Sequence, residues 1–439
     1  MHGMTGKFDK KNFALASDFS SREGYMNMIR LVALGVLMLI RQQGLAQQLE
    51  GYTPLEQEKW IQEEQPLKLK VSGGISYDSN VFRLSDGIDP QTAIGTSDKS
   101  DITFRLGAGG KYELRHSRQK FIAEANITEY KFNNFDNLDN TSSDLRGEWQ
   151  WQLGNDWSGD LGAGHRRFLE SFSNFQENLR DMVEQDRLYG TANYLLHSRL
   201  KLTLDADWVD TEHSEQTRSA LDSKINNTAF TVNWVTPAQN TVGLQYRTAD
   251  ASFPHPDTVA TTLVANDYTE NDYSIVAHLR LSGASEVSAR LGHTERKFDQ
   301  ASNRDFSGPT WRLTYRWLPT GKTALEFATW RELAEFRDRT ANYVRVTGIS
   351  VVPTWSIAPQ VVLRGKISHQ TLAYQGDSGN PAVTDRREDK ERLLQLSALW
   401  TPLRLTELAF NVENGRRTSN QAFTDYKYQA ISVLVTRYF

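Results

Sequence analysis

The chain has 439 residues, and its 50 Lys and Arg nearly balance its 54 Asp and Glu, so no global field would attract nucleic acid. Its mean hydropathy of -0.57 excludes a membrane protein made of several apolar helices, since each would need roughly 20 consecutive apolar residues. The absence of Cys excludes disulfides, thiolate metal sites and cysteine nucleophiles. So polar a chain nevertheless carries 11 Trp, 16 Tyr and 20 Phe, which need a place in the fold.

Residues 1–46 are predicted to be an N-terminal extension and a secretory signal. The one long apolar run, Leu31 to Ile40, is about half the length of a bilayer span, which disfavours a membrane anchor. Small residues in Gly44-Leu45-Ala46 predict cleavage after Ala46. A buried core helix is the alternative interpretation of the run. Residues 47–66 are then predicted to be a polar periplasmic lead-in, and residues 67–439 a single domain.

From residue 67 to the end, apolar residues take every second position over stretches of about ten residues. Ile102, Phe104 and Leu106, for example, alternate with Thr103 and Arg105. Such alternation places the two parities on opposite faces of a β-strand. Further strands are predicted around 145–153, 157–163, 188–196, 200–208, 230–234, 242–246, 273–279, 287–291, 311–317, 361–367, 394–400, 408–412 and 431–435. No segment of similar length has the helical period, so the chain is predicted to be all-β.

Short and long connections take turns between these strands. The short ones carry turn residues, as in Pro319-Thr-Gly321, and long polar stretches such as Glu170–Glu184 fall between them. Tight periplasmic turns and longer extracellular loops are typical of outer-membrane barrels, whereas a soluble sandwich has no reason to keep this rhythm. The count is about 18 strands, an even number. The prediction is a transmembrane antiparallel β-barrel in the bacterial outer membrane.

Aromatic residues near the predicted strand ends suggest girdles at the lipid headgroup level, although some of them could fill a sandwich core instead. The predicted girdle residues are Trp157, Trp208, Trp234, Trp311, Trp317 and Trp400. The last strand ends on Phe439, which resembles the signal that barrels present to the barrel-assembly machinery. Outer-membrane lipid and that machinery are therefore expected partners.

The polar parity is predicted to line a lumen, which in a barrel of this size can hold a water-filled channel. The predicted pore-lining residues are Arg105, Arg146, Glu148, Arg280, Arg290, Arg312, Arg316, Glu326, Arg364 and Glu407. Four of these arginines lie on three consecutive strands and could guide an anionic solute. Salt bridges to Glu286 and Glu326 that stiffen the wall are the favoured interpretation, because the counter-charges are present.

Motifs for catalysis are weak. The segment Pro319-Thr-Gly-Lys-Thr323 lacks the first glycine of a Walker motif and lies in a predicted turn. The nine His contain no close ligand pair, and Asp136, Asp139 and Asp144 lack the ordered spacing of a calcium loop. We therefore expect neither an enzyme nor a metal site, a cofactor or a nucleic-acid partner.

The segment Gly73-Gly-Ile-Ser-Tyr-Asp-Ser-Asn-Val-Phe-Arg-Leu84, followed by Ser85-Asp-Gly87, resembles the opening of the outer-membrane barrels called EpsL. Those barrels belong to exopolysaccharide operons associated with exosortase B. Their first strand ends in Asp-Asp-Asn, an aliphatic residue and Phe-Arg-Leu. Here the second Asp is Ser79, while Asp78, Asn80, Phe82 and Arg83 keep the pattern.

The resemblance implies an outer-membrane component that helps an exopolysaccharide cross the membrane, with the polymer and periplasmic export components as partners. The residues themselves also allow two other functions. One is a general, anion-tolerant porin for small solutes, for which Ala249–Thr269 is the candidate constriction loop. The other is a structural or adhesive surface barrel.

Overall fold

The structure is a computed structural model that describes residues 66–439, apart from residues 174, 260–261, 301–303, 335–342 and 377–385. The predicted signal segment and nearly all of the predicted lead-in lie outside the described residues. Within the described part of the chain, no helix is long and apolar enough to cross a bilayer.

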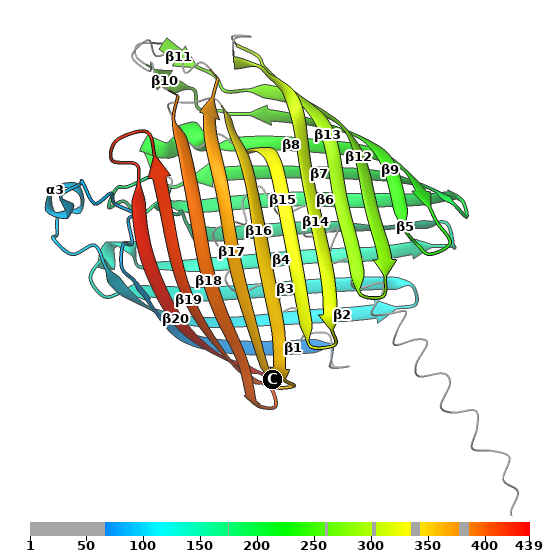
Figure 1. Cartoon of the computed structure of the whole chain (residues 1–439), viewed down its shortest axis with the longest axis horizontal. Helices are drawn as coiled ribbons and strands as arrows, with labels where there is room; N and C mark the ends of the chain where they lie inside the picture. Colours follow the sequence, from blue (N-terminus) through cyan, green and yellow to red (C-terminus); the bar gives the residue numbers. More distant parts are fainter. Residues whose placement is uncertain (1–65, 174, 260–261, 301–303, 335–342, 377–385) are drawn as a thin grey trace, which may run out of the picture. The chain divides into compact units, whose positions relative to one another are not determined.

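Eighteen long strands form a single antiparallel sheet, and consecutive long strands are paired (Figure 1). Their bounds are β1 (Leu67–Asp78), β2 (Asp101–His116), β3 (Gln119–Phe132), β4 (Asn140–Leu153), β5 (Trp157–Leu169), β6 (Met182–His197), β7 (Leu200–His213), β8 (Ser223–Val235), β9 (Thr241–Ser252), β12 (Tyr268–Ser282), β13 (Ser285–Phe298), β14 (Phe306–Thr320), β15 (Thr323–Ala334), β16 (Tyr343–Ala358), β17 (Val361–Gln375), β18 (Glu388–Leu403), β19 (Thr406–Ser419) and β20 (Tyr426–Tyr438). Small elements occupy the long connections: α3 (Pro90–Ile94), η2 (Asp136–Leu138), η3 (Gln216–Leu221) and the hairpin β10 (Asp257–Val259) with β11 (Thr262–Val264).

The sheet closes where β1 meets β20. The two strands pair antiparallel, from Lys70 opposite Tyr438 to Asp78 opposite Ala430. At the short-turn end, Leu69 and Phe439 exchange two backbone hydrogen bonds of 3.2 and 2.8 Å. Closure leaves the 18-stranded sheet without an edge, which is what a sheet needs to cross lipid. The predicted antiparallel barrel of about 18 strands is thereby confirmed.

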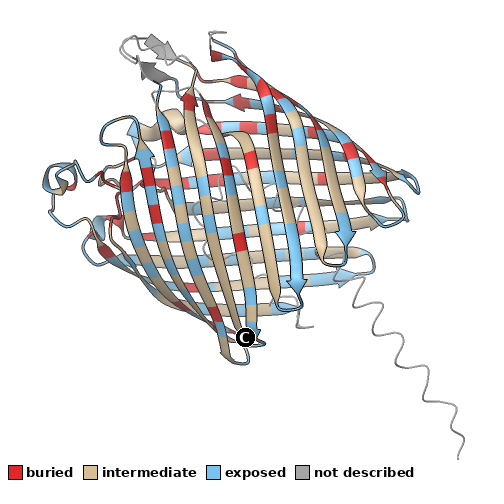
Figure 2. Cartoon of the chain, viewed as in Figure 1, coloured by how far each residue is buried: buried red, intermediate tan, exposed pale blue. Residues whose placement is uncertain are grey.

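The two parities of each strand lie on different faces, as the alternating burial along the ribbons shows (Figure 2). Large apolar side chains such as Leu106, Leu244 and Leu291 are more than half exposed, because they point out of the barrel. Their neighbours in sequence point inward and are half-buried or buried. An exposed apolar surface of this extent is stable only when lipid covers it. The apolar parity therefore marks the lipid-facing wall.

The strands have 12 to 16 residues and are longer than the sequence pattern indicates. Several stretches predicted as loops belong to strands: β4 begins at Asn140, β9 continues to Ser252, and β19 continues to Ser419. A tilted strand needs only about 9–11 residues to cross the membrane, so these strands extend beyond it at the long-loop end. There the outward residues are polar and the hydrophobic alternation ends, although backbone pairing continues.

The predicted girdle tryptophans all have the outward parity. Trp157, Trp234, Trp317 and Trp400 lie next to the short turns and are exposed. Trp208 and Trp311 lie in the long-loop halves of β7 and β14 and are half-buried. Phe439, the predicted assembly signal, also points outward and is 59% exposed.

Placing a charge on the lipid-facing wall should destabilise the barrel strongly. Leu291→Arg, in the middle of β13, is expected to lower the free energy of unfolding in lipid vesicles by about 2–4 kcal/mol. Glu295→Arg is the matched control, since it has the same parity on the same strand but lies above the apolar belt. Its effect should stay below about 1 kcal/mol. Denaturant titrations of both variants would measure this, and equal effects would contradict the assigned outer face.

Candidate functional site

The segment after β1 fastens the extracellular end of the seam. Asn80 is 1% exposed, and its side-chain amide donates to the carbonyl oxygens of Leu84 at 2.9 Å and Lys427 at 3.0 Å. Its Oδ1 accepts from the Leu84 N–H at 2.9 Å. Ser79 continues the pairing to β20, because its N–H donates to the Gln429 carbonyl at 2.9 Å. Asn80 therefore joins β1 and β20 beyond the last residue pair of the ladder.

Phe82 is the centre of an apolar cluster formed by three extracellular loops. Its side chain is fully buried, and its ring meets Phe135 and Phe172 edge-on at centroid distances of 4.7 Å each. Phe82 comes from the β1–β2 loop, Phe135 from the β3–β4 loop and Phe172 from the β5–β6 loop. The other buried members of the cluster are Val81, Leu84, Ile94, Leu138 and Phe175. The three loops are thereby packed into one body at this end of the barrel.

Arg83 is held in a left-handed conformation, with a φ of 55°. A non-glycine residue adopts this conformation only when its surroundings compensate for the strain. The Arg83 guanidinium pairs with Asp78 at 2.8 Å and stacks 3.6 Å above the Tyr428 ring. The Tyr428 ring in turn lies against Gly415 on β19, where an added Cβ would be only 2.1 Å from Cε1 of the ring. The motif residues Asp78, Asn80, Phe82 and Arg83 thus anchor the loops to the wall.

The loop Glu170–Asp181 lies inside the extracellular mouth. It leaves β5, yet the carbonyl of Ser173 accepts a 2.6 Å hydrogen bond from Nη1 of Arg417 on β19. Arg417 is buried and has the parity opposite to the exposed Val412, so it points into the barrel. Six strand-to-strand steps around the wall separate β5 from β19. The loop therefore connects two distant parts of the wall on the lumen side.

The prediction that Ala249–Thr269 is the candidate constriction loop is wrong, because both of its ends belong to strands of the wall. Residues 249–252 belong to β9 and residues 268–269 to β12, so they are part of the wall. Between them, β10 and β11 pair only with each other among the described residues. In Figure 1 this hairpin extends past the rim, away from the barrel. The alternating apolar residues of 249–252 point inward into an aromatic cluster with Phe253, and that reversal of parity concealed the strand.

Asp181 holds the other end of the loop. Its buried carboxylate accepts from Nδ1 of His213 at 2.8 Å and from Nε of Arg218 at 2.9 Å. The Arg218 guanidinium also stacks 4.1 Å above the Phe175 ring. Burial alone would raise the pKa of Asp181, but the hydrogen bond and charge of His213, together with the charge of Arg218, lower it below its usual value. The carboxylate is therefore ionised when the loop is docked.

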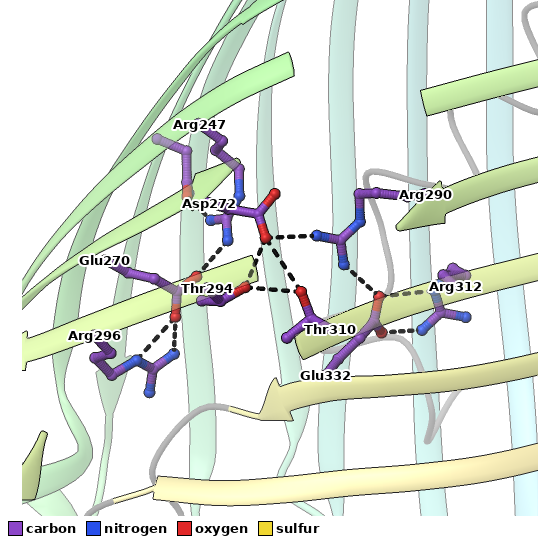
Figure 3. Close-up of polar contacts among 10 residues, drawn as sticks. Arg247, Glu270, Asp272, Arg290, Thr294, Arg296, Thr310, Arg312 and Glu332 are labelled. Atoms are coloured by element: carbon purple, nitrogen blue, oxygen red, sulfur yellow. Dashed lines mark hydrogen bonds and ion pairs between the residues drawn. The ribbon is translucent and has the colours of Figure 1, made fainter. Parts of the chain in front are cut away.

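Below the mouth, charged side chains on the inner wall from β9 to β15 form two neighbouring groups, one around Glu270 and one around Asp272 and Glu332, which are together called the network (Figure 3). Glu270 binds Arg247 and, through two hydrogen bonds of 2.9 and 2.6 Å, Arg296. Asp272, fully buried, accepts from Thr294 at 2.6 Å. Four guanidiniums and three carboxylates belong to this network, since Arg290, Arg312 and Glu332 complete it.

Glu332 joins the two arginines that the sequence analysis placed in a basic stripe. Its Oε1 accepts from Arg290 at 2.8 Å and from Arg312 at 3.0 Å, and Arg290 also reaches Asp272 at 3.3 Å. The expected partners were Glu286 and Glu326. Glu286 instead lies 3.0 Å from Nε2 of His278, nearer the short turns. The counter-charges thus come from strands on both sides of the arginines.

The other predicted lumen residues share the inward parity. Arg146 and Glu148 form an ion pair, and the Tyr189 hydroxyl donates to Glu148 at 2.6 Å. The remaining predicted lumen residues lie on β2, β12, β14, β15, β17 and β19, namely Arg105, Arg280, Arg316, Glu326, Arg364 and Glu407. The structure therefore brings Arg290 and Arg312 together and places Arg146 and Glu148 in a separate pair.

Several members of the network were not predicted from the sequence. Glu270 and Asp272 lie in a stretch that looked like the end of a loop, and Glu332 and Trp330 lie on a strand without clear alternation. Trp330 points inward over Gly348, 5.6 Å from the Arg312 guanidinium. Side chains alternate between the two faces of β15 after the turn at Gly321, and this alternation places Glu332 on the inner face, as it does Trp330. No other feature of the sequence indicates the position of Glu332.

A family model described as "Putative beta-barrel porin 2" matches residues 277–439, which comprise the end of β12 and all of β13 to β20. The chain is a porin-like outer-membrane β-barrel. No curated protein matches it. Among solved structures, it is similar to a BenF-like porin from Pseudomonas fluorescens, with 10% identity, a TM-score of 0.49, and 85% of this chain and 99% of that chain covered.

It is also similar to two proteins of Pseudomonas aeruginosa. For the outer-membrane protein OpdK the identity is 10%, the TM-score 0.48, and the coverage 85% of this chain and 99% of that one. For OccK2 in complex with glucuronate the identity is 10%, the TM-score 0.47, and the coverage 85% and 98%. Likenesses this distant concern the fold alone.

Removing the carboxylate shared by two arginines should change the ion preference of the lumen. Glu332→Gln keeps the shape of the side chain but leaves Arg290 and Arg312 without their common counter-charge. We expect the reversal potential in a KCl gradient across a planar bilayer to shift toward anions, most strongly at low salt. Glu388→Gln, the same change on the outer wall, should leave it unchanged. An unchanged potential in Glu332→Gln would place the network outside the ion path.

The Asp181 contacts should make loop docking sensitive to acid. Because the pKa of Asp181 is lowered in the docked loop, its carboxylate contributes fully above the unfolded value of about 3.9, and that contribution is lost as the pH falls through the lower folded value. Single-channel conductance should therefore stay constant down to about pH 5 and rise below about pH 4.

Asp181→Asn should show the raised conductance already at neutral pH, since the amide cannot balance Arg218. Asp98→Asn, in the exposed part of the β1–β2 loop, is the matched control and should behave as the wild type. If Asp181→Asn kept the wild-type conductance at every pH, Asp181 would not hold the loop.

Proposed function

We propose that this barrel is a passive, porin-like conduit for small hydrophilic solutes, and that the docked loop Glu170–Asp181 sets its size limit. The observation that carries the proposal is the hydrogen bond between the Ser173 carbonyl and Arg417, which lies on the lumen side of the wall. A loop held at both ends of its path across the mouth narrows the entrance.

The wall alone would be too wide to select small solutes. A circular ring of 18 strands, about 4.8 Å apart and tilted by about 40°, measures roughly 35 Å between opposite backbones. A barrel of this size can hold a water-filled channel. The constriction must therefore come from material inside the ring, and the β5–β6 loop and its aromatic cluster supply it.

The inner wall favours tolerance of anions over strict selectivity. In the network of β9 to β15, four guanidiniums face three carboxylates, so a small positive excess is left. Each charge has a partner close by, which lowers the field that a passing ion experiences. Transport of this kind needs no chemical step, so the proposed function is not enzymatic.

Passage of an exopolysaccharide is the second candidate function, and the motif from Asp78 to Arg83 favours it. In this chain the motif anchors the loops that cover the mouth. A polymer chain would have to displace the Glu170–Asp181 loop from Arg417 and from Arg218 before it could leave the barrel. The two candidate functions therefore differ in the position of the loop. The porin-like conduit functions with the loop docked, whereas passage of a polymer requires the loop to be displaced.

The decisive test replaces residues 171–180 by a short Gly-Ser linker and measures conductance in planar bilayers with polyethylene glycols of graded size. We expect a several-fold rise in conductance and entry of larger glycols. The matched control replaces residues 255–266, the β10–β11 hairpin, by the same linker and should leave both values unchanged. Equal values for the loop variant and the wild type would contradict the proposed size limit.

The same bilayers separate the two candidates. If wild-type channels conduct and soluble polysaccharide does not block them, the porin-like function is supported. If polysaccharide blocks wild-type channels from the periplasmic side with the loop intact, the polymer conduit replaces it.

A further inference from the structure

A row of basic side chains crosses four neighbouring strands on the outer wall. His369 on β17 lies opposite Arg392 on β18, Arg392 lies opposite Arg416 on β19, and Arg416 lies opposite Lys427 on β20. These strands lie side by side in Figure 1, coloured orange to red. Opposite residues in an antiparallel ladder are roughly 5 Å apart, so the four basic side chains form one band about 14 Å long.

All four side chains point away from the lumen. Arg392 has the parity of Leu394 and Leu396, each 56% exposed, and Arg416 has the parity of Val412, which is 50% exposed. His369 and Lys427 share the parity of exposed Ile367 and Ile431 in the same way. The row lies directly above the apolar belt, at the level where lipid headgroups of the outer leaflet meet the barrel.

Like charges directly opposite one another destabilise a β-ladder, so this row needs a counter-charge. Lys427 has Asp86 at 2.7 Å, and Nδ1 of His369 lies 3.1 Å from the Glu391 carbonyl. Arg392 and Arg416 have no carboxylate within ion-pairing distance among the residues that the structure describes. Their guanidiniums are exposed on the outer wall.

On the opposite side of the barrel, outward basic residues at the same height have carboxylate partners from neighbouring strands. On β5 to β8, Arg167 pairs with Glu184 at 3.0 Å and His165 with Asp186 at 2.8 Å. Lys224 pairs with Asp210 at 3.0 Å. Acidic residues also face each other between β6 and β7, but Glu184, Asp186 and Asp210 each have a basic partner on the other side. The row on β17 to β20 is therefore a local excess of positive charge.

We propose that His369, Arg392, Arg416 and Lys427 bind the phosphate groups of an anionic lipid in the outer leaflet. Guanidinium groups bind phosphate through paired, charge-assisted hydrogen bonds, and two of them side by side fit a headgroup with more than one phosphate. The acyl chains of such a lipid would cover the apolar residues directly below the row, among them Ile367, Leu394, Val412 and Ile431. The same four strands thus offer a basic row for the headgroup and an apolar surface for the acyl chains.

Binding is tested with the purified barrel in detergent and bis-phosphorylated lipid A as the probe, measured by native mass spectrometry. The double variant Arg392→Gln/Arg416→Gln should bind lipid A about tenfold more weakly or worse. The control Arg167→Gln/Lys224→Gln removes two outward charges that have carboxylate partners, and it should bind as the wild type does. Equal binding by wild type and double variant, or an equal loss in the control, would overturn the proposal.

Thermal unfolding supplies a second readout that a misfolded variant could not imitate. Without lipid, the double variant should melt at the wild-type temperature or above it, because repulsion within the row is relieved. Lipid A should raise the Tm of the wild type and leave that of the double variant unchanged. A double variant that melts lower without lipid, or gains as much from lipid A, contradicts the proposal.

Two further probes distinguish a lipid site from a site for any anion. Inorganic phosphate at the concentration of lipid A should neither raise the Tm nor displace the lipid, because it lacks the acyl chains. Phosphatidylethanolamine, with chains but no net charge, should bind far more weakly. Equal effects of free phosphate would indicate a simple anion site, and equal effects of phosphatidylethanolamine would indicate an apolar surface without headgroup recognition.

Discussion

The backbone hydrogen bonds between β1 and β20 are the constraint on which the other features depend. Lipid offers no partners to an unpaired N–H or C=O group, and each such group costs several kcal/mol, so an open sheet edge is excluded. The seam is held at both ends: Leu69 and Phe439 pair next to the short turns, and Asn80 binds the Lys427 carbonyl at the other end. With the ring closed, one parity must face lipid and the other must face the lumen.

Closure and the covering of the mouth use the same short segment. Asn80 extends the seam, and two residues later Phe82 enters the cluster that packs the Glu170–Asp181 loop. Arg83 contributes to both. Its side chain forms an ion pair with Asp78 and stacks on Tyr428 of the wall, and its backbone carbonyl accepts a hydrogen bond from the side-chain amide of Gln176 in the loop. Its strained backbone is therefore stabilised from both sides, and the wall and the loop are mechanically linked.

Periodicity could predict the parts of the fold that lipid imposes. Every outward position in the belt must be apolar, so residues such as Leu394 and Leu396 mark a strand and its face. Above the belt this requirement ends, and β9 and β19 consequently extend past their predicted limits. The site depends on pairings between distant residues, such as Ser173 with Arg417 and Arg312 with Glu332. Parity shows which side chains face inward, but the partner depends on register, which alternation alone does not determine.

Two adjacent rungs of the β18–β19 ladder show what distinguishes the faces. Glu391 opposes Arg417, and the next rung sets Arg392 against Arg416. The first rung points inward, where Nη2 of Arg417 lies 2.5 Å from Glu391 and no lipid is available to neutralise a charge. The second points outward with like charges opposed. One register produces both rungs, so strand pairing cannot explain the difference. On β5 to β8 the chain supplies carboxylate partners for outward basic residues, but on β18 and β19 its described part supplies none for Arg392 and Arg416. The unequal rungs follow if the protein balances the charges of its lumen internally and leaves this one part of its outer wall to be balanced by the phosphate groups of lipid.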